Sequence, residues 1–254
     1  MQLATWNVNS LTVRLPQVLD WLAANPVDAL VLQETKCTDD KFPQEALEAA
    51  GYKVAFFGQK TYNGVALLSR TEATDVVKNI PGFEDNMARV IAGTVDGVRV
   101  VGAYFPNGQA PDSDKFVYKM RWLEALQQWL REELKQHPKL VLMGDFNITV
   151  DDRDVWDPVA LKDTIHCTVE ERDHFQALIG LGTHDAFRLF EQAEKSYSWW
   201  DYREFAFRRN RGLRIDHILV SDALKPTVQA CVIDKAPRKN ERPSDHVPVV
   251  VTVA

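Results

Sequence analysis

The chain has 254 residues, of which 45% are hydrophobic and 26% charged, and its formal net charge is −6. This composition is ordinary for a globular protein with a large core, and the acidic balance argues against general charge-driven binding of nucleic acid while leaving room for a local basic face. No apolar run reaches the ~20 residues of a membrane span, and the N-terminus does not begin like a signal peptide. The three cysteines, Cys37, Cys167 and Cys231, are scattered. We therefore expect a cytoplasmic protein with reduced thiols that binds no membrane.

Predicted strands and helices follow one another along the whole chain. In chain order we expect strand 3–7, helix 15–24, strand 29–33, helix 44–50, strands 53–57, 65–69, 90–95 and 98–104, helix 116–135, strand 140–143, helix 169–178, and strands 215–220, 227–233 and 247–253. Asp96-Gly97 suits a two-residue hairpin turn between two of these strands. No linker or repeat interrupts the pattern, so residues 1–254 are expected to form one domain. About ten strands predict an α/β (α+β) fold in which two mixed sheets pack face to face with helices outside.

Polar side chains gather at the ends of the predicted strands. One such side chain alone is usually only a strand end, but six groups are harder to explain in that way. If the last strands run antiparallel to the others, all six groups meet at one rim, where ligand sites of α/β folds are common. The groups are Asn7 with Asn9, Glu34, Tyr104 with Asn107, Asp145 with Asn147, Asp216, and Asp245 with His246.

These side chains favour phosphoryl-transfer chemistry. Glu34, Asp145 and Asp245 offer hard oxygen ligands, which suit Mg²⁺ or Mn²⁺ better than zinc. A divalent ion with amides, a tyrosine and a histidine is typical of a site that hydrolyses phosphate esters. Acyl transfer is less favoured because Ser244 lies on no nucleophile elbow, and glycoside hydrolysis gives no reason for the asparagines.

One stretch near the C-terminus is both basic and aromatic. Arginines at 203, 208, 209, 211 and 214 are interleaved with Trp199, Trp200, Tyr202, Phe205 and Phe207. A solvated loop would explain the charge, but the aromatics favour a surface that binds phosphates and bases. We expect Arg209, Arg211 and Arg214 to contact the phosphates of a nucleic acid.

Six sequence blocks carry a resemblance that covers the whole chain. In order, they are "LATWNVNSL", "LVLQETKC", "GAYFPNG", "LVLMGDFNIT", "LRIDHILVS" and "PSDHVPV". They resemble the exonuclease III family of DNA-repair exonucleases and apurinic/apyrimidinic (AP) endonucleases, within the endonuclease/exonuclease/phosphatase superfamily. The resemblance implies a four-layer sandwich and a hydrolase that requires Mg²⁺, for which Mn²⁺ can substitute. It also implies a monomer that acts on double-stranded DNA with 3′ ends, nicks or abasic sites, associated with the nucleoid if the source is bacterial.

The resemblance also implies a role for each rim residue. Glu34 is the direct metal ligand, with Asn7 and Asn9 beside it, and Asp245 supports the metal or its water. Asp145 activates the attacking water and Asn147 helps to hold it, both close to the metal. His246 contacts the scissile phosphate and is oriented by Asp216 rather than by its neighbour Asp245, which predicts a short His246–Asp216 hydrogen bond. Tyr104 and Asn107 bind the phosphate or assist the leaving group.

One segment departs from the family pattern. In "LKDTIHCTVEERDHF", His166 and Cys167 stand where relatives carry a small residue and an aromatic one. The pocket for a flipped abasic sugar would be completed by Trp199, Leu213 and Ile215. We expect His166 to narrow or fill this pocket, disfavouring AP incision and leaving 3′→5′ exonuclease, 3′-phosphatase and 3′-phosphodiesterase activity. The alternative is that His166 points to solvent and changes nothing.

Three further interpretations remain open at this level. The chain could be a full AP endonuclease of base excision repair. It could be a superfamily phosphatase for a small or lipid phosphate, which would not need the basic and aromatic stretch. It could also be a non-catalytic DNA-binding module, although no expected ligand or base is missing from the sequence.

Overall fold

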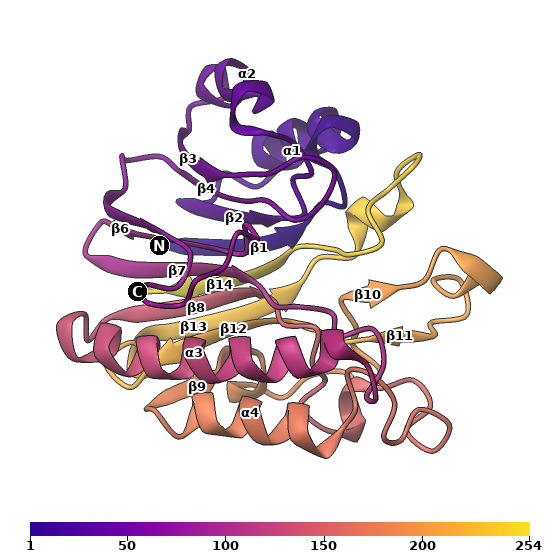
Figure 1. The fold of residues 1–254 in the computed structure, drawn as a ribbon. Coiled ribbons are helices and arrows are strands. Elements are labelled where there is room, and N and C mark those ends of the chain that lie inside the picture. The colour runs from indigo at the N-terminus through magenta and orange to yellow at the C-terminus, as the bar shows by residue number, and fades with distance from the viewer.

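Two six-stranded sheets lie face to face between two layers of helices in the computed structural model, which describes residues 1–254. Figure 1 shows α1 (Leu11–Ala24) and α2 (Gln44–Ala49) on one outer face, and α3 (Asp114–Gln136) and α4 (Val169–Ile179) on the other. Both sheets contain parallel and antiparallel pairs. The predicted sandwich of two mixed sheets with outer helices is confirmed. No helix is long and apolar enough to cross a membrane.

Each sheet combines strands from distant parts of the sequence. The first sheet has the order β13-β14-β1-β2-β4-β3 and contains β1 (Gln2–Asn7), β2 (Ala29–Gln33), β3 (Lys53–Phe57), β4 (Val65–Ser69), β13 (Val228–Ile233) and β14 (Val249–Val253). The second has the order β5-β6-β7-β8-β12-β9 and contains β5 (Thr74–Lys78), β6 (Val90–Val95), β7 (Val98–Tyr104), β8 (Leu140–Asp145), β9 (Thr183–Asp185) and β12 (Asp216–Ser221). A small separate hairpin is formed by β10 (Trp199–Trp200) and β11 (Gly212–Leu213).

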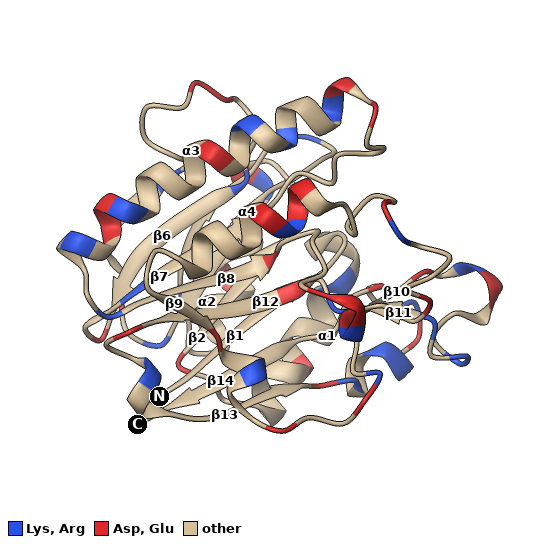
Figure 2. Cartoon of the chain, turned by 90° about the horizontal axis from the view of Figure 1, so that it is seen from below, with Lys and Arg blue, Asp and Glu red and all other residues tan.

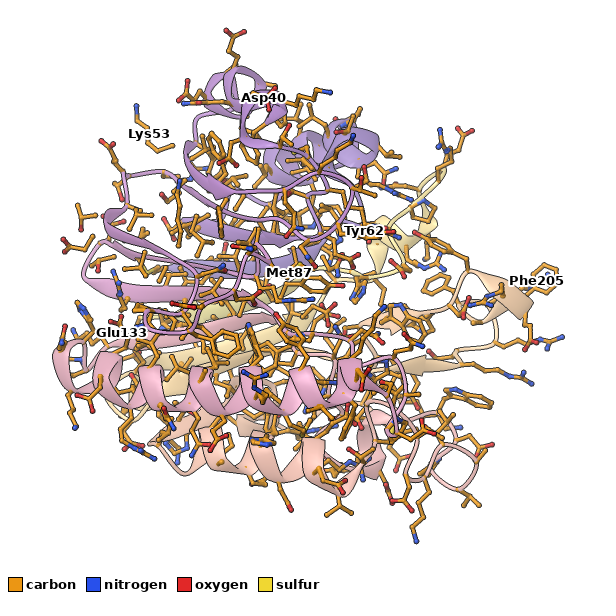
Figure 3. The ribbon with its side chains drawn as sticks, viewed as in Figure 1. Asp40, Lys53, Tyr62, Met87, Glu133 and Phe205 are labelled. Atoms are coloured by element: carbon orange, nitrogen blue, oxygen red, sulfur yellow. The ribbon has the colours of Figure 1, made fainter.

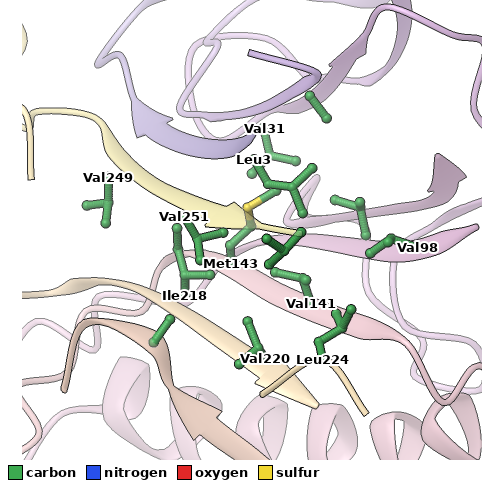
Figure 4. Packing of buried hydrophobic residues seen from close by; sticks show 14 of the residues in the cluster. Leu3, Val31, Val98, Val141, Met143, Ile218, Val220, Leu224, Val249 and Val251 are labelled. Carbon is green, nitrogen blue, oxygen red and sulfur yellow. The ribbon is translucent and has the colours of Figure 1, made fainter. Parts of the chain in front are cut away.

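The central strands, such as β1, β2, β4, β7 and β8, are buried on both faces, which explains their nearly continuous apolar sequences. Leu3 and Val31 point between the two sheets and pack in one cluster with Met143, Ile218 and Val251 (Figure 4). Alternate residues of the same strands face the helices: Ala4 and Leu30 pack in a second cluster under α1 and α2. A third cluster fills the space between the second sheet and α3 and α4.

The predicted and observed elements differ mainly at their ends. Five predicted strands have the observed bounds, from Ala29–Gln33 through Val98–Tyr104. The first helix begins earlier than predicted, at Leu11, where the Ser10 side chain accepts a hydrogen bond from the Val13 amide. The last strand begins at Val249, directly after Pro248, which has no N–H for the ladder. Three short strands (β9, β10 and β11) and the exposed edge strand β5 were not predicted.

Strand register brings the polar strand ends to one rim. In the antiparallel β8–β12 pair Asp145 lies directly opposite Asp216, and in the parallel β7–β8 pair it lies beside Tyr104. β14 runs antiparallel to β1, so its first residues lie near the end of β1 that carries Asn7. The predicted convergence of the polar groups is confirmed. The chain termini lie at the opposite end of the sandwich (Figure 1), and Asp96-Gly97 forms the predicted turn with φ of 48° and 83°.

Candidate active site

Asn7, Glu34 and Asp145 form one hydrogen-bonded group at this rim. The Asn7 side-chain amide donates to Glu34 Oε2 and, over 2.9 Å, to Asp145 Oδ2. One ligand atom each from Glu34, Asp145 and His246 lie within 4.8 Å of one another. Two carboxylates and an imidazole at this spacing could hold a hard divalent cation, with the Asn7 amide fixing both carboxylates.

The backbone at the strand ends turns through the left-handed region. Asn9, Glu34 and Asn147 have φ values of 44°, 53° and 50°. Asparagine adopts this conformation readily, but glutamate does so rarely, and such outliers concentrate at functional sites. At Glu34 the turn is held by the Ser10 amide, which donates to the Glu34 carbonyl over 2.8 Å.

His246 is paired with Asp216, as predicted. Its Nδ1 lies 2.8 Å from Asp216 Oδ2, and its Nε2 faces Asp145 Oδ2 at 3.5 Å. Burial acts to lower the pKa of His246, but the carboxylates of Asp216 and Asp145 outweigh it and hold the pKa well above its usual value. The imidazole is therefore poised to carry a positive charge at neutral pH.

The loop before β14 delivers His246 through hydrogen bonds to β1. Ser244 Oγ donates to the Asn7 carbonyl over 2.7 Å, and Trp6 Nε1 donates to the His246 carbonyl over 3.2 Å. The Ser244 hydroxyl is buried and used in this contact. It therefore holds the loop in place and is not free to act as a nucleophile.

Asp145 lies in a strongly negative and buried environment. Burial raises the pKa of Asp145 to about 7; His246 acts against this, while the nearby Asp216 and Glu34 carboxylates add to it. Its other oxygen, Oδ1, accepts from the Asn147 backbone amide over 3.0 Å. A carboxylate with this pKa suits proton transfer near neutral pH.

Asp245 lies beside this group but does not join it. Its two oxygens accept from Asn9 Nδ2 over 3.2 Å and from Trp199 Nε1 over 3.0 Å. Lys36, which the sequence analysis missed, donates to Asn9 Oδ1 over 2.7 Å and lies 3.5 Å from Glu34 Oε1. The signal for Lys36 was its place in the block "QETK", two residues after Glu34.

Tyr104, Asn107 and Asn147 line the rim on the side of the second sheet. Burial raises the pKa of Tyr104 well above its usual value, and the Glu34 and Asp145 carboxylates add to this, so the phenol is neutral. Asn107 is exposed. Tyr104 and Asn107 also border a cavity of about 640 Å³ that includes Tyr62 and Met87, both labelled in Figure 3.

A second cavity, of about 520 Å³, contains the predicted pocket residues. His166, Trp199 and Leu213 all line it, and Ile215 packs behind Leu213 in a small apolar cluster. The His166 ring donates from Nδ1 to the Asn147 carbonyl over 2.7 Å. The half-buried ring is therefore turned toward Asn147 and not free in solvent, while its effect on activity stays a prediction.

His166 occupies a position that favours glycine. Its φ is 73°, in the left-handed region that side chains other than Asn and Gly seldom adopt. Burial, with the charge of Lys119, lowers the pKa of His166 to about 4. The ring is thus neutral at pH 7. Because the carbonyl can only accept, the hydrogen bond selects the tautomer with its proton on Nδ1.

The three arginines expected to contact DNA lie in different environments. Arg209 is exposed on the loop between β10 and β11, which projects from the body with Phe205 at its tip (Figure 3). Arg211 stacks over the Trp156 ring at 5.0 Å and lines the His166 cavity. The third, Arg214, is 1% exposed. The prediction that Arg214 contacts DNA is wrong.

Arg214 instead holds the cavity wall to the second sheet. It forms ion pairs of 2.7 Å with Asp154 and with Asp185. Replacing Arg214 with Met leaves Asp185 without its ion pair and leaves the buried Asp154 with Arg188 alone, so we expect the free energy of unfolding to fall by about 3 kcal/mol. Urea unfolding measures this. The matched control, Arg209→Met, should leave stability within about 0.5 kcal/mol because Arg209 is exposed. Equal stabilities of the two variants would contradict the assignment.

Charge of both signs is spread over the protein surface. Figure 2 shows acidic and basic residues interspersed along α3, with basic residues also on the loops around β10 and β11. The acidic groups of the candidate site lie at the strand ends, inside the rim. A polyanion would therefore need a local counter-charge, such as a cation held by these carboxylates, to approach the rim.

A buried His–Asp pair beside clustered carboxylates that could hold a cation suits the hydrolysis of phosphate esters. Residues 4–246 match the endonuclease/exonuclease/phosphatase family. Exodeoxyribonuclease III of Haemophilus influenzae is 36% identical over 266 residues, covering 98% of each chain. The chain therefore belongs to this family, in its branch of exonuclease III and AP endonuclease hydrolases.

Solved structures agree closely with the fold. A 3′-5′ exonuclease from Neisseria meningitidis is 50% identical with a TM-score of 0.98, covering 100% of this chain and 99% of that one. A Neisseria 3′ phosphatase bound to a product DNA hairpin is 49% identical, with the same TM-score and coverage. An AP endonuclease from Archaeoglobus fulgidus is 35% identical with a TM-score of 0.96, again covering 100% and 99%.

Proposed function

We propose that this protein is a Mg²⁺-dependent 3′-end-processing nuclease of double-stranded DNA in the cytoplasm, acting as a 3′→5′ exonuclease and 3′-phosphatase or phosphodiesterase with weak AP endonuclease activity. The observation that carries the proposal is the linked set of Asn7, Glu34, Asp145, His246 and Asp216, together with a cavity lined by His166. The Neisseria relatives are a 3′-5′ exonuclease and a 3′ phosphatase, which supports the proposal that this protein acts at 3′ ends.

The donor set fits a hard cation. Glu34 is the proposed direct ligand, and Asp145 with Asn7 and Asn147 borders the same position. Asp245 supports it indirectly, through Asn9. Bound there, Mg²⁺, or Mn²⁺ in its place, would neutralise charge on the phosphate and on the leaving oxygen.

The remaining residues act on the phosphate and the water. Asp145 accepts the proton of the attacking water, for which its raised pKa is suited. His246, held by Asp216, presents a cationic Nε2 to a non-bridging oxygen. Tyr104 and Asn107 bind the phosphate or the departing 3′-oxygen as neutral donors, while Asn147 steadies the water. Arg209 and Arg211 contact the DNA backbone beside the cavity.

His166 is the proposed determinant of the balance between activities. Its ring is bonded to the Asn147 carbonyl and lines the cavity together with Trp199, so it takes room that a flipped abasic sugar would need there. A terminal phosphate at a 3′ end needs no such pocket, because nothing has to be flipped out of a continuous strand. The same site therefore processes 3′ ends while disfavouring internal AP sites.

Replacing His166 with Gly should increase AP incision. Excess bulk in a tight site costs about 1–3 kcal/mol, which corresponds to roughly a 5- to 150-fold gain when it is removed. The φ of 73° suits glycine, so the backbone needs no change. The assay uses a duplex with one internal abasic site, with 3′-phosphate removal from a nicked duplex as the reference activity.

A second variant separates bulk from hydrogen bonding at this position. His166→Phe keeps an aromatic ring and removes the donor to the Asn147 carbonyl. We expect no gain in AP incision from it. A gain of equal size in both variants, or no gain in His166→Gly, would contradict the pocket-blocking role.

Full AP endonuclease activity is the second candidate. The cavity beside His166 still measures about 520 Å³, and the Archaeoglobus relative is an AP endonuclease. Under this alternative the wild-type protein would cleave at an abasic site at least as fast as it removes a 3′-phosphate. A phosphatase for small or lipid phosphates is less favoured, because the projecting loop with Phe205 and Arg209 would have no use.

A further inference from the structure

Lys119 lies at the centre of a buried group of hydrogen bonds beneath the candidate site. It is on α3, and its side chain is 0% exposed. Its Nζ donates to the Asn107 carbonyl over 3.1 Å, to the Asn147 carbonyl over 2.8 Å and to Glu171 Oε1 over 2.5 Å. An ammonium group has three hydrogens, so its donors are fully used.

Glu171 extends this group to the wall of the His166 cavity. Its other oxygen, Oε2, accepts from the Thr168 backbone amide over 3.1 Å and from the Thr168 hydroxyl over 2.8 Å, in the capping box that begins α4. His166, two residues before Thr168, donates to the Asn147 carbonyl that Lys119 also contacts. Three loops that border the site are thus tied to a single ammonium group.

The fit around Lys119 is close. A Cβ atom on Gly108, next to Asn107, would lie 3.0 Å from Lys119 Cδ. The lysine stem therefore packs directly against the loop whose carbonyl its Nζ binds. A small shift of the ammonium group would therefore displace Asn107 and Asn147 as well, because the packing leaves no free space to absorb it.

We propose that Lys119 is a positioning residue that fixes the separation of Asn107 and Asn147 across the scissile phosphate. This inference rests on the proposed function, which places both asparagines at the phosphate and its water. Lys119 touches only their backbone carbonyls and does not reach the substrate. Because a misplacement of about 1 Å can cost ~10²-fold in rate, loss of these two bonds should lower kcat.

Stability alone does not explain a fully buried Lys–Glu pair. Replacement of such pairs by uncharged residues is often neutral or stabilising, whereas removal of one partner is strongly destabilising. A double replacement can therefore remove the positioning contacts while keeping the fold. Lys119→Met with Glu171→Gln removes both charges and retains an oxygen at residue 171 for the Thr168 cap.

The chain offers a matched control pair that joins the same helix, α3, to β7. Arg99 and Glu133 form a buried pair, 2.8 Å apart, and Arg99 also donates to the Asp75 carbonyl over 2.8 Å. Glu133 lies at the end of α3 far from the projecting β10–β11 loop (Figure 3). Arg99→Met with Glu133→Gln makes the same chemical change away from the site.

The test measures kcat and KM for 3′-phosphate removal from a nicked duplex with Mg²⁺, together with thermal unfolding. We expect the Lys119/Glu171 double variant to lose roughly 10²-fold in kcat, and the Arg99/Glu133 double variant to keep the wild-type kcat at a similar unfolding temperature. Glu171→Gln alone should lose far less than the double variant, because both carbonyl contacts of Lys119 remain.

The outcomes separate the possible failures. A folded Lys119/Glu171 double variant with wild-type kcat overturns the positioning role, as does an equal loss in the Arg99/Glu133 control. If the double variant does not fold, Lys119→Gln takes its place. Glutamine keeps two donors on a shorter side chain, so this variant should lose about tenfold in kcat. An unchanged kcat in Lys119→Gln overturns the proposal. A wild-type protein that is inactive with Mg²⁺ refutes the proposed function instead.

Discussion

Replacing Asp145 with Asn should lower kcat for 3′-phosphate removal by about 10²–10⁴-fold, the range a general base contributes. The carboxylate is buried, accepts from the Asn7 side chain and the Asn147 amide, and has a pKa raised to about 7. An amide of the same shape keeps the volume but cannot accept the proton of water. The change also removes one negative oxygen from the cation-binding group.

Single-turnover kinetics with excess enzyme measure this effect free of product release. Asp151→Asn is the control, because Asp151 is partly exposed and its carboxylate bonds to Arg153 and to no residue of the candidate site. It should behave like the wild type. An Asp145→Asn variant that retains more than about a tenth of the wild-type rate would show that another group activates the water.

Replacing Asp216 with Asn should lower kcat by roughly 10²–10⁴-fold, as the corresponding change does in acyl-transfer triads. Asp216 accepts from His246 Nδ1 over 2.8 Å and holds the pKa of the imidazole well above its usual value. Without the carboxylate the ring is free to change tautomer, and the pKa of His246 falls because one carboxylate fewer offsets the effect of burial.

The pH profile distinguishes lost charge from lost folding. In the wild type the raised pKa keeps His246 protonated through neutral pH. In Asp216→Asn the pKa of His246 falls, so the ring loses its charge at a lower pH and activity should decline at a lower pH than in the wild type. Rate measurements from pH 5.5 to 8.5 test this. A variant profile parallel to that of the wild type would mean that the His246 charge does not contribute.

Much of the fold could be predicted because most strands are buried on both faces. Continuous apolar sequences such as Ala29–Gln33 and Val65–Ser69 have few other interpretations once their turns are recognised. The edge strand Thr74–Lys78 escaped prediction because it is exposed and mixes polar with apolar residues. β10 and β11 are two residues each, and tertiary contacts rather than local pattern define them.

The candidate site could be predicted where side chains able to bind a metal or a phosphate stand at the ends of predicted strands. Adjacent side chains on a strand diverge, which made Asp245 a poor partner for His246; the resemblance to the exonuclease III family supplied Asp216 as the partner. Arg214 could not be placed from its charge, since only the fold shows that Asp154 and Asp185 surround it. Lys36 was missed because its role depends on the turn at Glu34, where the φ of 53° is not evident from sequence.

The most direct test of the central claim is a gel assay of the wild-type protein on three labelled duplexes: a recessed 3′ end, a nick with a 3′-phosphate, and an internal abasic site, each with Mg²⁺ and with EDTA. We predict 3′-phosphate removal and 3′-end shortening with Mg²⁺, neither with EDTA, and little cleavage of the abasic duplex. Activity that persists in EDTA, or abasic cleavage as fast as 3′-phosphate removal, would contradict the account.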